Sequence, residues 1–257
     1  MMIGIESFRN YFKGFEKEYV IIGGTACDLL LSDKGLDFRS TKDIDMVLII
    51  EVLSKKFAKT FWEYVSEAGY TYINKKSGEY EFYRFYGPKN LNYPKMIELF
   101  SRNQHWLTPK IKQHIAPIHI DDEISSLSAI LLNEDYYTLL TKGTCIINDI
   151  SILKAEYIIP FKAKAWLDLR QRKNQGEHID QHNIKKHKND IIRLSILLTP
   201  DTKIELPHII REDLSQFIQD FDKEELDLKQ FGMRDMTKND IIQLLFKIYG
   251  LPILQKI

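Results

Sequence analysis

The stretch that decides the fold runs from Gly23 to Ile50 and reads GGTACDLLLSDKGLDFRSTKDIDMVLII. Two glycines end the apolar run EYVII, a helix-like stretch follows, and Asp43 and Asp45 then open a second apolar run. β-Branched residues before glycine predict a short buried strand, and IDMVLII predicts another. The stretch therefore predicts a strand, a turn, a helix and a second strand within one domain.

Length and composition limit the class of protein. The chain has 257 residues, of which 44% are hydrophobic, enough for one large core or two modest ones. Basic and acidic residues number 36 each, so the overall charge gives no general attraction to nucleic acid. The two cysteines make no disulfide framework, and no apolar run reaches about 18 residues. We expect a cytoplasmic protein without a signal peptide or a membrane span.

The rest of the chain predicts strands mixed with helices, followed by helices alone. Strand-like runs are KMIELFS (95–101), SAILL (128–132) and TCIINDISIL (144–153), the last with an Asn-Asp turn inside it, while residues 70–87 are typical of a hairpin. Helical spacing marks residues 54–69, 155–172, 183–198, 211–221 and 238–250. The expected fold class is α+β, with a catalytic-type domain over 1–153 and a helical domain over 154–257.

The glycine pair is typical of an anion site. Glycine lets the backbone approach a phosphate closely, and the N-terminus of a helix offers unpaired N–H groups. Thr25 adds a hydroxyl in the first helical turn. Gly-Gly turns are also common as plain turns, so this signal alone leaves the purely structural alternative open.

The paired aspartates strengthen the functional interpretation. Side chains at i and i+2 of a strand point to the same face, and two carboxylates there repel unless a cation compensates them. Magnesium binds through one or two carboxylates plus substrate phosphates, and two ions serve phosphoryl displacement. The alternative is that Asp43 ends a loop and Asp45 is a solvated edge residue.

The order Gly23-Gly24-Thr25, then Arg39-x-Thr41-x-Asp43-x-Asp45, resembles the nucleotidyltransferase fold of the DNA polymerase β superfamily. More closely, it resembles the branch that contains the AbiE-type abortive-infection toxins and related toxin–antitoxin nucleotidyltransferases. The resemblance implies a mixed sheet with helices, a helical C-terminal domain, and a third acidic residue on a later strand.

Glu98 matches that third acidic position. It is a single charge within Met96-Ile97-x-Leu99-Phe100, where burial is costly without a cation. Its alternative is a strand-edge carboxylate that faces solvent. Glu79 and Glu81 lie beside the predicted hairpin turn, and we expect both to be solvated.

The resemblance extends into the helical half and covers about residues 18–198. Lys162 in IIPFKAKAWLDL matches a lysine that would contact nucleotide phosphates, with Lys164 as the alternative. Asp190 in KKHKNDIIRL matches an aspartate that would lie beside the nucleotide or position Lys162. Asp190 also stands four residues after Lys186, so a solvated face of ion pairs is the plain alternative.

The resemblance implies a nucleotidyltransferase that uses Mg²⁺ or Mn²⁺ and moves a nucleoside monophosphate from a nucleoside triphosphate to an acceptor hydroxyl. The implied catalytic and metal residues are Asp43, Asp45 and Glu98, and the implied nucleotide-binding residues are Gly23, Gly24, Thr25, Arg39, Thr41, Lys162 and Asp190. The implied partners are an RNA (such as tRNA) or protein acceptor and an antitoxin. The alternatives are a catalytically silent binding module of the same fold and an antibiotic-type nucleotidyltransferase.

Three other features of the sequence each allow a structural interpretation as well as a functional one. The basic clusters QRKNQ (171–175) and KKHK (185–188) would meet RNA phosphates or form solvated surface. The aromatic residues of the hairpin, Tyr80, Phe82, Tyr83, Phe85 and Tyr86, favour sheet packing over base stacking. His178 and His182 are spaced as a metal pair, but no third ligand is evident.

Overall fold

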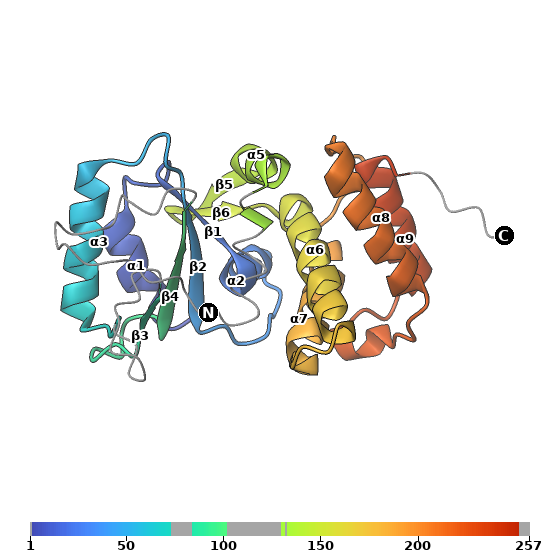
Figure 1. Cartoon of the computed structure of the whole chain (residues 1–257), viewed down its shortest axis with the longest axis horizontal. Helices are drawn as coiled ribbons and strands as arrows, with labels where there is room; N and C mark the ends of the chain where they lie inside the picture. The colour runs from blue at the N-terminus through green and yellow to red at the C-terminus, as the bar shows by residue number, and fades with distance from the viewer. Residues whose placement is uncertain (1, 73–83, 102–129, 132, 252–257) are drawn as a thin grey trace. The chain divides into compact units, whose positions relative to one another are not determined.

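The computed structural model describes residues 2–72, 84–101, 130–131 and 133–251. The chain divides into two compact units, which are drawn in Figure 1. The sheet unit comprises Met1–Ile120 and Thr144–Lys154, and the helical unit comprises Asp121–Gly143 and Ala155–Ile257. No helix among the described residues is long and apolar enough to span a bilayer.

The sheet unit contains a mixed six-stranded sheet of order β3-β4-β2-β1-β6-β5. Its elements are α1 (Ile5–Phe12), β1 (Tyr19–Ile22), α2 (Gly23–Asp33), β2 (Asp43–Leu48), α3 (Lys55–Ala68), β3 (Arg84–Tyr86), β4 (Met96–Phe100), β5 (Thr144–Ile147) and β6 (Ile150–Leu153). The pairs β2–β4 and β1–β6 are parallel, and the pairs β1–β2, β3–β4 and β5–β6 are antiparallel. The predicted α+β class is confirmed.

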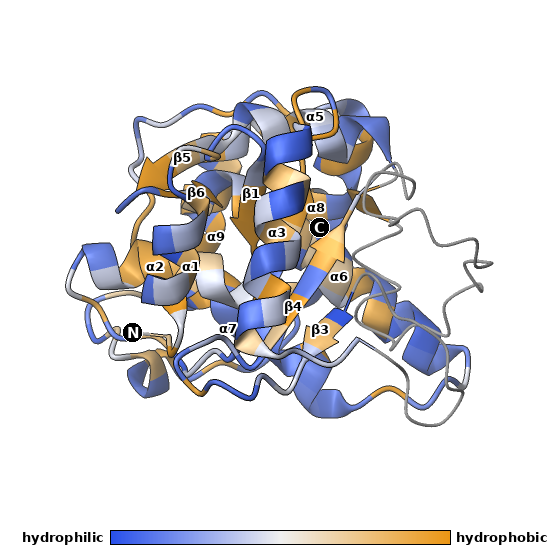
Figure 2. Cartoon of the chain, turned by 90° about the vertical axis from the view of Figure 1, so that its left-hand side faces the viewer, coloured by the Kyte–Doolittle hydropathy of each residue, from blue (hydrophilic) through white to orange (hydrophobic). Residues whose placement is uncertain are grey.

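The helices cover the two faces of this sheet differently. Figure 1 shows α1 and α3 on one face and α2 on the other. Rings from α1 and α3 pack edge-on against the sheet, as Phe8 does on Tyr19 and Phe61 on Phe85, with centroids 5.5 and 5.1 Å apart. Polar residues follow the outward side of α3 in Figure 2. The α1–α3 face therefore supports the sheet, and the face toward α2 is left for the polar residues of β2.

Local signals account for the boundaries that were predicted correctly. Ser54 accepts a hydrogen bond from the backbone N–H of Phe57 and caps α3, which ends at Gly69 in the left-handed region. Asn148 and Asp149 have φ of 49° and 59°, as a two-residue hairpin turn between β5 and β6 requires.

The helical unit contains α5 (Glu134–Lys142), α6 (Ala155–Asn174), α7 (Gln181–Ser195), α8 (His208–Asp222), the 3₁₀ helix η1 (Leu228–Phe231) and α9 (Lys238–Tyr249). The sequence predicted α6 to α9 but not α5. This helix belongs to the helical unit, although the predicted boundary assigned all of 1–153 to the first domain. Tyr136 of α5 explains its placement, since it stacks edge-on against Phe161 and donates a 3.0 Å hydrogen bond to Asp213.

The predicted strand SAILL was wrong where the structure describes it. Ile130 and Leu131 are helical. A short apolar run has no period that separates a strand from a buried helix, so sequence alone could not decide. The predicted hairpin turn lies outside the described residues, together with Glu79, Tyr80, Glu81, Phe82 and Tyr83. The two arms do pair where they are described, through mutual backbone hydrogen bonds between Thr71 and Tyr86.

Helix α6 contains Pro160 six residues into the helix. Proline has no N–H, so the carbonyl of Glu156, four residues earlier, has no helical donor. The hydroxyl of Tyr249 at the end of α9 donates a 2.7 Å hydrogen bond to this carbonyl. A tertiary contact therefore satisfies the backbone group that the proline leaves unpaired.

We predict that Tyr249→Phe lowers the free energy of unfolding by about 1 to 3 kcal/mol, because it leaves the partly buried carbonyl of Glu156 without a hydrogen-bond donor. Pro160→Ala restores an N–H for the same carbonyl, so the loss should shrink in the double variant. Urea unfolding of the wild type, both single variants and the double variant measures this coupling. Equal losses with and without Pro160 would contradict the assigned role of the tyrosine.

Candidate active site

Strand β1 passes directly into helix α2 at Gly23, which has φ of 69°. The two glycines are the first residues of the helix, so the helix begins two residues earlier than predicted. A Cβ atom on Gly23 would overlap Oδ2 of Asp45. The missing side chain therefore lets the Asp45 carboxylate lie against the N-terminus of α2, where the helix dipole favours a negative charge.

Gly24 makes room for two more of the predicted residues. A Cβ atom there would lie 3.0 Å from Nη2 of Arg39 and 3.0 Å from Cγ2 of Thr41. The Arg39 guanidinium also lies 5.1 Å from the ring centroid of Phe38. The loop between α2 and β2 thus returns over the first helical turn and adds a positive charge to it.

The two threonines of the motif differ in their surroundings. Thr25 is fully buried, and its hydroxyl donates a 2.6 Å hydrogen bond to the backbone carbonyl of Asp43. This bond fixes the start of β2, so in this structure the hydroxyl proton of Thr25 is used within the protein. Oγ1 of Thr41 is buried and has no hydrogen-bond partner among the described residues. A buried hydroxyl of this kind is suited to a ligand contact.

Three charged side chains form a row across three neighbouring strands. Asp45 on β2 is in register with Glu98 on β4, and Glu98 is in register with Arg84 on β3. Residues in register point to the same face of a sheet. Nε and Nη2 of Arg84 lie 2.9 and 2.8 Å from Oε1 of Glu98. We name the three carboxylates Asp43, Asp45 and Glu98 the carboxylate row, and Arg84 lies beside it on β3.

The charge state of Glu98 reflects its neighbours. Glu98 is 7% exposed, and burial raises the pKa of its carboxyl above the usual value. The negative charge of Asp43 raises the pKa further, while the Arg84 ion pair and a hydrogen bond with Asp45 oppose the rise. Asp43 and Asp45 therefore both influence the pKa of Glu98. Arg84, directly across from Glu98 on β3, is the cation that pairs with it.

The carboxylate row has the donor chemistry of a magnesium or manganese site. Both ions prefer carboxylate oxygens, and the row offers three carboxylates on two adjacent strands. In the described part of the chain, no group of three or more His, Cys, Asp or Glu side chains forms a ready-made metal cage. Oε1 of Glu98 is bound to Arg84. The carboxylate oxygens are therefore of the type that the ion prefers. For Oε1 of Glu98 to bind the ion, its ion pair with Arg84 has to break.

The predicted residues of the helical unit form a buried ion pair. Nζ of Lys162 lies 2.8 Å from Oδ2 of Asp190, and the two residues are 5% and 0% exposed. Asp190 is therefore not part of a solvated face of ion pairs, and its geometry suits positioning of Lys162. Lys164, two residues further along α6, instead pairs with Asp213 of α8 at 2.7 Å.

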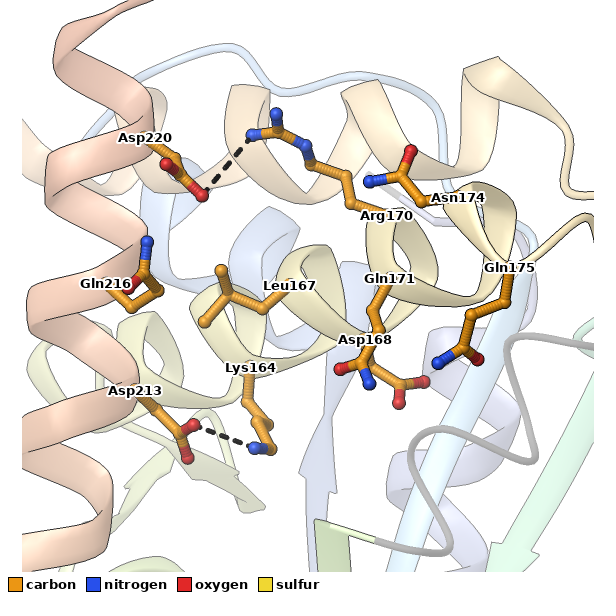
Figure 3. Close-up of a pocket in the computed structure, with 10 residues that line it drawn as sticks. All are labelled: Lys164, Leu167, Asp168, Arg170, Gln171, Asn174, Gln175, Asp213, Gln216 and Asp220. Atoms are coloured by element: carbon orange, nitrogen blue, oxygen red, sulfur yellow. Dashed lines mark hydrogen bonds and ion pairs between the residues drawn. The ribbon is translucent and has the colours of Figure 1, made fainter.

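A pocket of about 430 Å³ lies in the helical unit between α6 and α8 (Figure 3). Lys164 pairs there with Asp213, and Nη1 of Arg170 lies 4.0 Å from Asp220. The lining holds three carboxylates, two cations and four carboxamides, contributed by Asp168, Asp213, Asp220, Lys164, Arg170, Gln171, Asn174, Gln175 and Gln216. Because its cations face acidic partners, this pocket does not favour phosphate.

Each basic cluster contains a cation that is paired with a glutamate. Arg172 pairs with Glu177 at 2.7 Å, and Lys188 pairs with Glu224. These contacts favour the solvated-surface interpretation over RNA binding. His178 precedes α7, whereas His182 lies in its first turn, so the two histidines do not share a helix.

Arg84 is the residue that sequence analysis missed. The signal was a single charge in the aromatic run FYRFY, the counterpart of Glu98 in MIELF. Phe85 beside it packs on Phe61 and Trp62, so sheet packing accounts for this described aromatic residue of the hairpin.

Comparisons of the chain with protein-family models, curated proteins and solved structures found no match. A function for this chain therefore has to come from its own residues and their geometry.

We predict that Gly23→Ala destabilises the protein more than Gly35→Ala does. Both glycines have φ of 69°, so both variants share a backbone cost of about 1 kcal/mol. Gly35 has nothing within 4 Å of its added Cβ, whereas Gly23 meets Asp45. The overlap should add about 1 to 3 kcal/mol, measured by urea unfolding. Equal losses would show that Asp45 does not depend on the missing side chain.

Proposed function

We propose that the chain is a nucleotidyltransferase that uses Mg²⁺ or Mn²⁺ to move a nucleoside monophosphate from a nucleoside triphosphate to an acceptor hydroxyl. The observation that carries this proposal is the contact of Gly23 with Asp45. It joins a helix N-terminus suited to phosphates with carboxylates suited to divalent ions, as substrate phosphates and metal share ligands in phosphoryl transfer.

The triphosphate would lie on the start of α2. The backbone N–H groups of the first turn offer donors, and the side chains of Asp45, Arg39 and Thr41 lie against the two glycines there. Arg39 beside Gly24 supplies a positive charge, and the Thr41 hydroxyl is a buried donor suited to a phosphate oxygen. Thr25 contributes indirectly, because its bond to the Asp43 carbonyl fixes the strand that carries the aspartates.

The carboxylate row would bind the metal ions and activate the acceptor hydroxyl. Bound Mg²⁺ or Mn²⁺ neutralises phosphate oxygens and lowers the pKa of a coordinated hydroxyl. Asp43 and Asp45 would hold the ions, and the Glu98 carboxylate would accept the proton of the acceptor hydroxyl or ligate the second ion. The hydroxyl oxygen forms a bond to the α-phosphorus, the bond to the bridging oxygen breaks, and pyrophosphate leaves with the electron pair.

The resemblance to toxin-type nucleotidyltransferases supplies the expected biological setting. It suggests an RNA or protein acceptor, with an antitoxin as a further partner. It also assigns Lys162 to phosphate contacts, and the buried ion pair with Asp190 supports a positioning role for Asp190. Arg172 and Lys188, one cation from each basic cluster, are paired with glutamates and so give no support to an RNA acceptor over a protein acceptor.

Label transfer tests the activity. Purified protein is incubated with each α-labelled nucleoside triphosphate, Mg²⁺ or Mn²⁺, and total tRNA, cell lysate or buffer. We predict that Asp45→Asn lowers transfer about 100-fold or more without unfolding the protein, because metal stabilisation of transition-state charge is worth several kcal/mol. The exposed Asp37 offers a matched control, and Asp37→Asn should retain full transfer.

Full transfer by a folded Asp45→Asn variant would contradict the metal assignment. Nucleotide binding that persists in the Asp43→Ala/Asp45→Ala variant, with no transfer by the wild type, would favour the silent binding module. Transfer to an aminoglycoside in the absence of RNA would favour the antibiotic-type enzyme.

A further inference from the structure

We propose that Arg84 is a resident counter-cation that holds Glu98 in the metal-free protein and competes with a divalent ion for its carboxylate. The proposal rests on the proposed function, since it takes the carboxylate row as the metal site. It assigns a positioning role to a residue on β3, the strand that ends the described part of the sheet on that side.

The ion pair is directed at one oxygen atom. Nε and Nη2 of Arg84 both lie within 2.9 Å of Oε1 of Glu98. The side chains of Arg84 and Glu98 are 20% and 9% exposed, so water screens the pair less than it screens a surface ion pair. An oxygen that already accepts two hydrogen bonds from a guanidinium binds a metal ion more weakly than an oxygen without such bonds.

The surrounding charges explain why a cation is needed there. Asp45 faces Glu98 from β2, and the negative charge of Asp43 also acts on Glu98. Arg84 faces Glu98 from β3 on the other side. Removal of one partner from a buried ion pair leaves an uncompensated charge, so the metal-free row depends on Arg84. A divalent ion would supply the same compensation and make the guanidinium redundant.

Binding of the ion through Oε1 would therefore transfer this oxygen from Arg84 to the metal. The positive charge of the guanidinium would then act on an anionic oxygen of the substrate from the neighbouring strand. Arg84 thus links metal binding to the electrostatics of the phosphate side, and no covalent step is involved.

Manganese affinity of the metal-free protein tests this competition. Mn²⁺ is titrated into wild type and Arg84→Gln, and free Mn²⁺ is followed by electron paramagnetic resonance. We expect Arg84→Gln to bind Mn²⁺ about tenfold more tightly, because a competing charged hydrogen bond is gone. Lys34→Gln is the matched control, since it removes one positive charge from an exposed ion pair with Asp33, and should bind as wild type does.

Thermal unfolding provides a second readout. The melting temperature of metal-free Arg84→Gln should fall below that of wild type, and saturating Mn²⁺ should recover most of the difference. A fall that Mn²⁺ leaves unchanged would show that Arg84 is only a structural partner of Glu98, and would overturn the proposal.

The wild type itself gives a test that does not depend on a variant that folds poorly. The Nε–H resonance of Arg84, assigned by its loss in Arg84→Lys, should move toward the position of a solvated arginine when Mg²⁺ saturates the protein. An unmoved resonance, or equal Mn²⁺ affinity in wild type and Arg84→Gln, overturns the proposal but leaves the proposed function intact. Absence of Mn²⁺ binding in both proteins overturns the two together.

Discussion

The rest of this structure depends on the compensation of three neighbouring carboxylates in the sheet unit. Arg84 on the adjacent strand β3 supplies one positive charge to them. Asp43, Asp45 and Glu98 repel one another, and burial of Glu98 makes the repulsion more costly. The chain compensates in two ways: the Arg84 ion pair and the N-terminus of α2 beside Asp45. Each needs an accurately placed backbone, which the aromatic contacts on the opposite face of the sheet provide.

The sequence predicted the parts of this arrangement that arise from local pattern. Apolar runs marked β1, β2 and β4, and the i, i+2 spacing put Asp43 and Asp45 on one face. Arg84 could not be found this way, because its partnership with Glu98 depends on the register between two strands, which local periodicity does not define. The role of Thr25 was equally hidden, since it depends on the helix beginning at Gly23 and on the distance to the backbone of Asp43.

The helical unit shows the same division between local pattern and tertiary structure. Periodicity located α6 to α9, but the apolar run that includes Ile130 and Leu131 gave the wrong element because it is too short to show a period. In sequence, only the apolar residues IIPF before Lys162 favoured it over Lys164. On the helix they point in different directions, one to Asp190 in α7 and the other to Asp213 in α8.

The central claim is that the carboxylate row and the start of α2 form one site for a divalent ion and a triphosphate. A crystal structure with Mn²⁺ and an unreactive nucleoside triphosphate analogue tests it most directly, since manganese is located by its anomalous scattering. The account predicts manganese at Asp43 and Asp45, with the phosphates on the first turn of α2. Manganese or phosphates bound elsewhere, with the carboxylate row unchanged, would contradict it.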